Sequence, residues 1–285
     1  MMKKYFCLPF CFLVLAFSVM FGVDNTSLSK KDFLPYERTY GVVFPVASKS
    51  VRDVLEKTQG ALTETLLQNG LLKEVLRYNI PHITVLHIHN PDPSTPEKIL
   101  HALPVPPKPF SLYLSHYSFI KASPHTSLPW WFDIGVEKSL GFDQIADYNR
   151  EVAIAIAPLR ATPIPSFTGP VYAGLDKVAQ SQIRDFGVSG INAITNNQKH
   201  ERYRPHMTLV YSDHALDKTI TTAMAGVAKR FNEVMKTPIK ADFDTLSIVE
   251  IGFLGNVLRE IYRIDLATHK VYDVQKGEFI EIKRD

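Results

Sequence analysis

The chain has 285 residues, of which 45% are hydrophobic and 21% are charged, and its formal net charge is +3. This length can bury a proper core in one large or two small domains, and the composition is that of an ordinary globular protein. The small net charge excludes the strong basic field that marks a dedicated duplex-DNA binder.

The N-terminal segment, residues 1–22, has the layout of a secretory signal. Lys3 and Lys4 form a positively charged start, and an apolar run then continues to about Val23. A polar spacer follows over residues 23–38. We therefore expect a signal peptide and a secreted or periplasmic mature protein. Because the run is about as long as a membrane span requires, a retained N-terminal anchor that tethers the protein to the membrane is the alternative.

Both cysteines, Cys7 and Cys11, lie inside this segment. Cleavage would leave a mature chain without disulfides, thiolate metal ligands or a cysteine nucleophile. Its stability would then depend on the core alone.

The rest of the chain, 39–285, is expected to form one domain of strands and helices. In chain order, hydrophobic periodicity predicts a strand at 40–46, a helix at 50–72, a strand at 82–89, a helix at 94–104, strands at 110–120 and 130–136, and a helix at 142–160. The second half follows with a helix at 171–187, a strand at 206–212, a helix at 215–235, two strands within 243–266 and a terminal hairpin at 270–282. Ser50 is the expected N-cap of the first helix, and Gly255-Asn256 is the expected two-residue turn between the two strands. Few elements alternate strictly as strand and helix, so the pattern favours an α+β fold with a weak internal duplication.

One short pattern occurs twice, each time at the start of a predicted strand. The first copy is "PHITV", with His82 and Thr84, and the second is "PHMTLVY", with His206 and Thr208. Residues two apart on a strand share a face, so each strand presents an imidazole beside a hydroxyl. The residue between them points into the core.

Two such strands brought together would place two imidazoles around a small space. An unperturbed histidine titrates near pH 6.5, so at neutral pH one ring can act as a base and the other as an acid. The threonine hydroxyls can donate hydrogen bonds to phosphate oxygens. A phosphodiester held there could be cleaved without a metal ion or another cofactor.

On these two motifs the chain resembles the two-histidine phosphoesterase superfamily, which includes bacterial 2′-5′ RNA ligase-like proteins and cyclic nucleotide phosphodiesterases. The resemblance implies a bilobal fold of two antiparallel sheets with outer helices and a central cleft that carries both His-x-Thr strands. We set the lobes at roughly 39–160 and 161–285. It also implies that His82 and His206 are the acid–base pair and that Thr84 and Thr208 bind phosphate. Which histidine is the acid stays open.

Other residues are weaker candidates. Tyr203 and Arg204 precede the second motif and could contact substrate, or they form a solvated loop. Asp133 could orient a histidine. His87 and His89 could form half of a metal site, but surface or structural histidines are favoured because no carboxylate or cysteine stands at ligand spacing. No metal ligands are therefore proposed.

The sequence thus predicts an exported, metal-independent phosphodiesterase that hydrolyses a 2′,3′-cyclic phosphate or a 2′-5′ linkage in a nucleotide or short RNA. A monomer is expected. The alternatives are a non-catalytic nucleotide- or RNA-binding protein on the same fold and an envelope scaffold in which the motifs are core strands.

Overall fold

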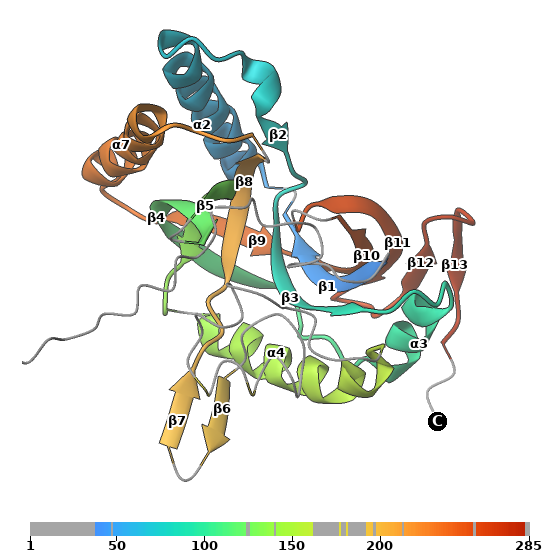
Figure 1. Cartoon of the computed structure of the whole chain (residues 1–285). Helices are drawn as coiled ribbons and strands as arrows, with labels where there is room; N and C mark the ends of the chain where they lie inside the picture. The colour runs from blue at the N-terminus through green and yellow to red at the C-terminus, as the bar shows by residue number, and fades with distance from the viewer. Residues whose placement is uncertain are drawn as a thin grey trace, which may run out of the picture.

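A computed structural model describes residues 38–46, 48–123, 126–139, 141–161, 177, 181, 192–195, 198–212, 214–252 and 255–282 of the chain (Figure 1). The predicted signal segment, the spacer up to residue 37 and most of the predicted helix 171–187 lie outside these residues. Within them, no helix is long and apolar enough to cross a membrane.

Sheet A has six antiparallel strands in the order β13–β12–β11–β10–β1–β3. They are β1 (Thr39–Pro45), β3 (His82–His89), β10 (Thr245–Ile251), β11 (Val257–Asp265), β12 (Val271–Asp273) and β13 (Glu278–Ile280). The strand of the first motif, β3, therefore forms one edge of this sheet.

Sheet B has five antiparallel strands in the order β2–β8–β5–β4–β9. They are β2 (Arg77–Tyr78), β4 (Phe110–Ser123), β5 (Thr126–Val136), β8 (His206–Ser212) and β9 (Ile239–Phe243). The strand of the second motif, β8, is next to the edge and is covered there only by the short β2. A separate ribbon joins β6 (Asn192–Thr195) and β7 (Gln198–Glu201).

Two pairs of helices cover the sheets on the outside (Figure 1). Sheet B is packed by α2 (Lys49–Gln68) and α7 (Lys218–Val234), and sheet A by α3 (Thr95–Ala102) and α4 (Phe142–Ile156). Two short 3₁₀ turns, η1 (Lys73–Val75) and η2 (Ala157–Leu159), follow α2 and α4. The α+β class with two antiparallel sheets and outer helices is thereby confirmed.

The helix starts follow ordinary capping rules, with one difference from expectation. The Asp217 side chain accepts a 2.8 Å hydrogen bond from the Ile220 amide at the start of α7, and α3 carries a proline in its first turn. In α2 the N-cap is Ser48 and not Ser50, because the helix already begins at Lys49.

Each sheet combines strands from both halves of the chain. In sheet A, β1 pairs with β10, and in sheet B, β4 pairs with β9 and β5 with β8. The predicted boundary between 39–160 and 161–285 is therefore wrong as a division into lobes. The pairing of strands far apart in sequence decides which sheet each strand joins, and local periodicity does not contain that information.

The turn between β10 and β11 also differs from the prediction. The strands stop at Ile251 and resume at Val257, and the Gly252 amide donates a 2.8 Å hydrogen bond to the Asn256 carbonyl oxygen. The connection is thus longer than a two-residue turn. Gly255 lies in it at φ +78°, which a glycine adopts without strain.

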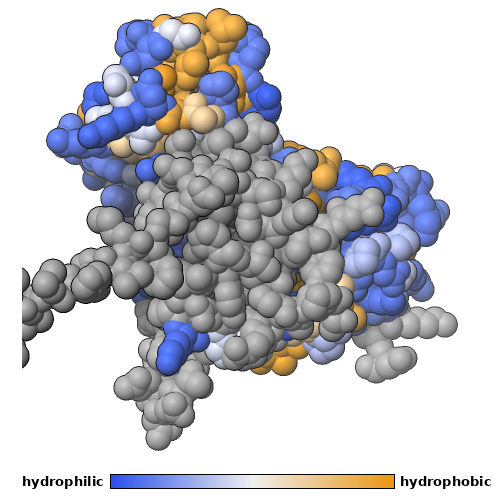
Figure 2. Space-filling model, in the orientation of Figure 1, coloured by the Kyte–Doolittle hydropathy of each residue, from blue (hydrophilic) through white to orange (hydrophobic). Residues whose placement is uncertain are grey.

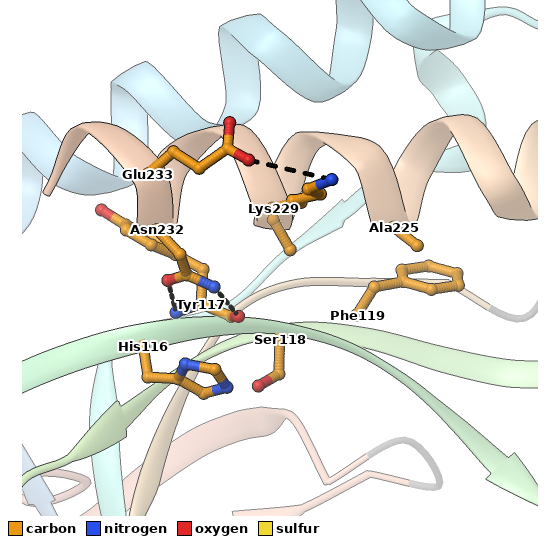
Figure 3. A pocket seen from close by; sticks show the side chains of 9 residues that line it. His116, Tyr117, Ser118, Phe119, Ala225, Lys229, Asn232 and Glu233 are labelled. Atoms are coloured by element: carbon orange, nitrogen blue, oxygen red, sulfur yellow. Dashed lines mark hydrogen bonds and ion pairs between the residues drawn. The ribbon is translucent and has the colours of Figure 1, made fainter.

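Asn232 of α7 holds a bulge in β4. The bulge adds His116 between Ser115 and Tyr117, and His116 has a φ of 64°. The Asn232 side chain accepts from the Tyr117 amide at 2.7 Å and donates to the Tyr117 carbonyl at 2.8 Å (Figure 3). In the same view His116 and Ser118 point to the side of β4 away from α7. The bulge thus turns two polar side chains toward the face opposite the helices.

The core is essentially one cluster that runs through both sheets, and Trp130, Phe44, Phe132 and Phe243 are among its largest fully buried side chains. Figure 2 shows hydrophobic residues at the surface over the end of α2. The large exposed hydrophobic side chains in that part of the chain are Leu67 and Leu72.

Candidate active site

The first motif begins where the chain crosses from sheet B to sheet A. It leaves β2 at Tyr78 and enters β3 at His82. The His82 ring places Nδ1 2.7 Å from the Ile80 carbonyl oxygen. A carbonyl can only accept, so Nδ1 carries the hydrogen and the neutral ring keeps its lone pair on Nε2.

The second motif has the same local geometry. His206 Nδ1 donates to the Arg204 carbonyl oxygen at 2.9 Å, again two residues earlier in the chain. In both motifs the proline directly before the histidine also accepts a backbone hydrogen bond through its carbonyl oxygen. Pro81 accepts from the Val46 amide at 2.9 Å, and Pro205 accepts from the Val136 amide at 3.2 Å. Both copies therefore fix the orientation and the tautomer of their histidine through the backbone.

A bulge follows the threonine in each motif strand. On β3 the register passes from Val43↔Thr84 to Val42↔Leu86, and on β8 it passes from Asp133↔Thr208 to Phe132↔Val210. One extra residue is accommodated each time, and the two residues after each threonine are fully buried. The internal duplication thus extends from the sequence motif to an irregularity of the backbone.

The fold brings the two motifs together. Strands β3 and β8 lie beside each other where the two sheets meet (Figure 1). The Tyr203 hydroxyl donates a 2.8 Å hydrogen bond to the Thr84 carbonyl oxygen and so links the segment before β8 to β3. His206 is also among the groups that lower the pKa of His82, after burial.

The two candidate substrate contacts are placed differently. Tyr203 is 3% exposed and burial raises its pKa, so its hydroxyl stays protonated and remains a hydrogen-bond donor to Thr84. This position does not fit a substrate contact, and we describe Tyr203 as a residue that joins the two motifs. Arg204 is exposed, and its guanidinium lies 3.4 Å from the Tyr203 carbonyl oxygen.

The surroundings of the two histidines differ. His82 is 5% exposed, and burial is the main cause that lowers its pKa to about 4. It is therefore neutral at pH 7. The His206 side chain is 52% exposed, and its Nε2 lies 3.8 Å from Oδ2 of Asp133. Burial raises the pKa of Asp133, while the charge of His206 and the Thr208 hydroxyl act in the opposite direction.

The bulge on β3 has a second effect. It shifts the alternation by one residue, so that His87 and His89 lie on the face of His82 and Thr84. Burial lowers the pKa of His87 to about 4 and that of His89 to about 3, and His89 Nδ1 lies 2.8 Å from the Thr39 hydroxyl. Of the two alternatives, surface or structural histidines, their burial supports the structural one. Among the residues described, no cluster of three or more histidine, cysteine or acidic side chains is arranged to hold a metal ion.

A pocket between β4 and α7 lies on the helical side of sheet B and contains none of the predicted site residues (Figure 3). Asp133 is the residue at the site that the sequence pattern indicates only weakly. Its strand is predicted, but its position opposite Thr208 depends on the pairing of β5 with β8.

No protein-family model matches the sequence, and no curated protein matches it. Usb1 from Kluyveromyces marxianus is structurally similar, with a TM-score of 0.46 and 8% identity over 81% of this chain and 100% of that chain. The same protein with uridine monophosphate gives a TM-score of 0.43 and 9% identity over 84% and 100%. The protein TT0787 of Thermus thermophilus gives 0.45 and 12% over 81% and 98%.

Proposed function

We propose that the chain is a two-histidine phosphodiesterase that hydrolyses a 2′,3′-cyclic phosphate or a 2′-5′ linkage in a nucleotide or short RNA, without a metal ion. One observation carries the proposal: two His-x-Thr strands with the same backbone-fixed histidine tautomer lie side by side where the sheets meet. A scaffold protein would have no need to fix both rings in this way.

The two surroundings suggest different roles in the reaction. Neutral His82, with the lone pair on Nε2, takes a proton from the attacking water. The new P–O bond forms as the bond to the leaving oxygen breaks, and protonated His206 gives its Nε2 proton to that oxygen. Thr84 donates a hydrogen bond to a non-bridging oxygen, and Thr208 does the same once its single hydroxyl proton turns from Asp133 to the phosphate. Solvent then restores the proton to His206 and removes it from His82, so the cycle is balanced.

The test is hydrolysis of a panel by the protein without residues 1–22. The panel holds 2′,3′-cyclic mononucleotides, 2′-5′ dinucleotides, 3′-5′ cyclic dinucleotides and short RNAs with cyclic-phosphate ends, each with EDTA. His82→Ala and His206→Ala should each lower kcat by about 10²- to 10⁴-fold. Wild-type rates in both variants would contradict the proposal. Tight binding of a panel member without turnover would support the non-catalytic alternative.

Export is a further part of the proposal, and the composition of residues 1–22 supports it. The full chain, expressed in a bacterial host, should be recovered outside the cytoplasm with a new N-terminus near residue 23, determined by N-terminal sequencing. An intact chain in the membrane fraction would instead indicate the retained anchor, and an intact cytoplasmic chain would contradict export. We expect the mature protein to be a monomer by light scattering.

A further inference from the structure

Asp133 is the acidic residue that the structure places beside the second histidine. It lies on β5 opposite Thr208, in the register that also sets Gly135 opposite His206. Paired residues on neighbouring antiparallel strands share a face, so the carboxyl group is on the face of His206 and Thr208. The 3.8 Å between Oδ2 and His206 Nε2 is an ion-pair distance and exceeds that of a hydrogen bond.

The first motif provides an internal comparison. Val43 lies opposite Thr84 just as Asp133 lies opposite Thr208. Val43 is fully buried in a small apolar cluster with Val249 and Ile251. The two motifs therefore match in the proline, the histidine, the threonine and the bulge, and they differ in the residue that faces the threonine.

Core packing does not explain this difference. Asp133 is 4% exposed, and its Oδ1 is buried without a hydrogen-bond partner in the part of the chain that the structure describes. A buried carboxyl group is costly unless it is paired, and an apolar residue would pack there more favourably, as Val43 does in the first motif. Asp133 thus leaves one carboxyl oxygen without a partner at the place where the first motif has a well-packed apolar side chain.

Three groups surround the contact between Asp133 and His206: the His82 ring, the Arg204 carbonyl and the Thr208 hydroxyl. Asp133 faces His206 from β5, and His82 faces it from β3. His82 is neutral at pH 7, so it does not oppose a charge on His206. The Nδ1 proton is held by the Arg204 carbonyl, and at 3.8 Å the carboxylate does not engage the Nε2 proton in a hydrogen bond. That proton stays available to a substrate oxygen.

We propose that Asp133 is a positioning residue, whose carboxyl group beside Nε2 makes the second histidine the acid and leaves the first as the base. This inference deepens the proposed function and rests on it. Val43 at the matching position leaves the first motif without a carboxylate, and the same pair of motifs thereby acquires two different roles.

The coupling of the two groups can be tested without a substrate. The ¹³C resonance of the Asp133 carboxyl carbon is followed against pH in the wild-type protein and in His206→Gln. Loss of the positive charge should move the Asp133 titration to higher pH, because the charged ring favours the ionised carboxylate. An unchanged titration overturns the inference, whether or not the protein hydrolyses any member of the panel.

Kinetics then test the role. Asp133→Asn keeps the shape and removes the charge, and we expect kcat to fall by about 10- to 100-fold with KM changed by less than about threefold. The alkaline limb of its pH–rate profile should move to lower pH. Ser118→Ala, which changes the β4 residue paired with Asp133 on its other side, is the matched control and should keep wild-type kinetics. A uniform loss of activity with an unchanged profile would show a merely structural role.

Discussion

The phenolic hydroxyl of Tyr203 donates a hydrogen bond to the backbone carbonyl oxygen of Thr84, 119 residues earlier in the chain. This bond ties the segment that enters β8 to the third residue of the first motif strand. Because Tyr203 is buried, the bond is shielded from water, and it helps to fix the spacing of the two motifs.

Removing this hydroxyl should loosen the site. Tyr203→Phe leaves the Thr84 carbonyl without its partner, and we expect a loss of about 1–2 kcal/mol in the free energy of unfolding. The catalytic rate should also fall, because the distance between the motifs is no longer held. Urea unfolding and hydrolysis are measured together. Tyr113→Phe on β4 is the control and should change the free energy of unfolding by less than about 0.5 kcal/mol.

The two motif threonines should act on the transition state. Thr84→Val and Thr208→Val keep the shape of the side chain and remove the hydroxyl donor, so each should lower kcat/KM by about tenfold. The acid limb of the pH–rate profile should stay in place in Thr84→Val, because the base is unchanged. A variant with full activity would exclude that threonine from phosphate binding.

The burial of His82 sets the low-pH limit of activity. A base must be deprotonated to act, and burial lowers the pKa of His82 to about 4. We therefore expect hydrolysis to persist at pH 5 to 6, where a histidine with the ordinary value of about 6.5 would be largely protonated. The measurement is kcat/KM against pH at constant ionic strength. An acid limb centred near 6.5 would contradict the assignment of His82 as the base.

Buried histidines should also make the fold sensitive to acid. The pKa of His82 is lowered to about 4 and that of His89 to about 3, so the unfolded chain binds more protons than the folded one below about pH 6.5. The stabilisation is thus complete above that pH and is lost as the pH falls toward 4. Each histidine should cost about 2 kcal/mol between pH 7 and pH 5.

Urea unfolding at a series of pH values measures this dependence. His89→Gln should flatten the curve between pH 7 and pH 5, even if the variant is less stable at pH 7. His101→Gln, an exposed histidine of α3, is the control and should leave the slope as it is. If the free energy of unfolding changes equally with pH in the wild type and in His89→Gln, His89 is not the source of the acid sensitivity.

Two asparagine side chains should stabilise the bulges they bind. Asn149 of α4 donates to the Val85 carbonyl at the bulge of β3 at 2.7 Å, and Asn232 bonds both the amide and the carbonyl of Tyr117. Replacement by alanine should cost about 1–3 kcal/mol for Asn149 and more for Asn232, because two backbone groups lose their partner. Thermal unfolding would reveal the difference, and equal values would contradict it.

The sequence predicts the elements well where the pattern is local. Strands β3 and β8 and helix α7 follow from alternation and capping, and the side-by-side placement of His82 and Thr84 follows from the strand period. The bulges do not follow, because an extra residue on one strand is defined only by the register of its partner. His87 and His89 therefore reach the motif face for a reason that the single strand does not reveal.

Long-range pairing explains the remaining differences. An aromatic residue between two arginines looks like a ligand contact, and only the tertiary packing shows that Tyr203 is buried. The prediction lacks strand β9, although its residues Ile239–Phe243 alternate between apolar and charged. Five residues are a weak local signal, and it is the pairing with β4 that stabilises this strand. The position of Asp133 opposite Thr208 depends in the same way on β5 meeting β8.

The interleaved sheets have a consequence for incomplete chains. His82 and His206 are both present once synthesis reaches β8, but sheet A still lacks β10 to β13 and sheet B still lacks β9. A truncated chain released at that point carries both histidines but lacks the strands that hold them in position. We expect it to be inert and not half active, so that chemistry by this chain becomes available only after its last strands have been made.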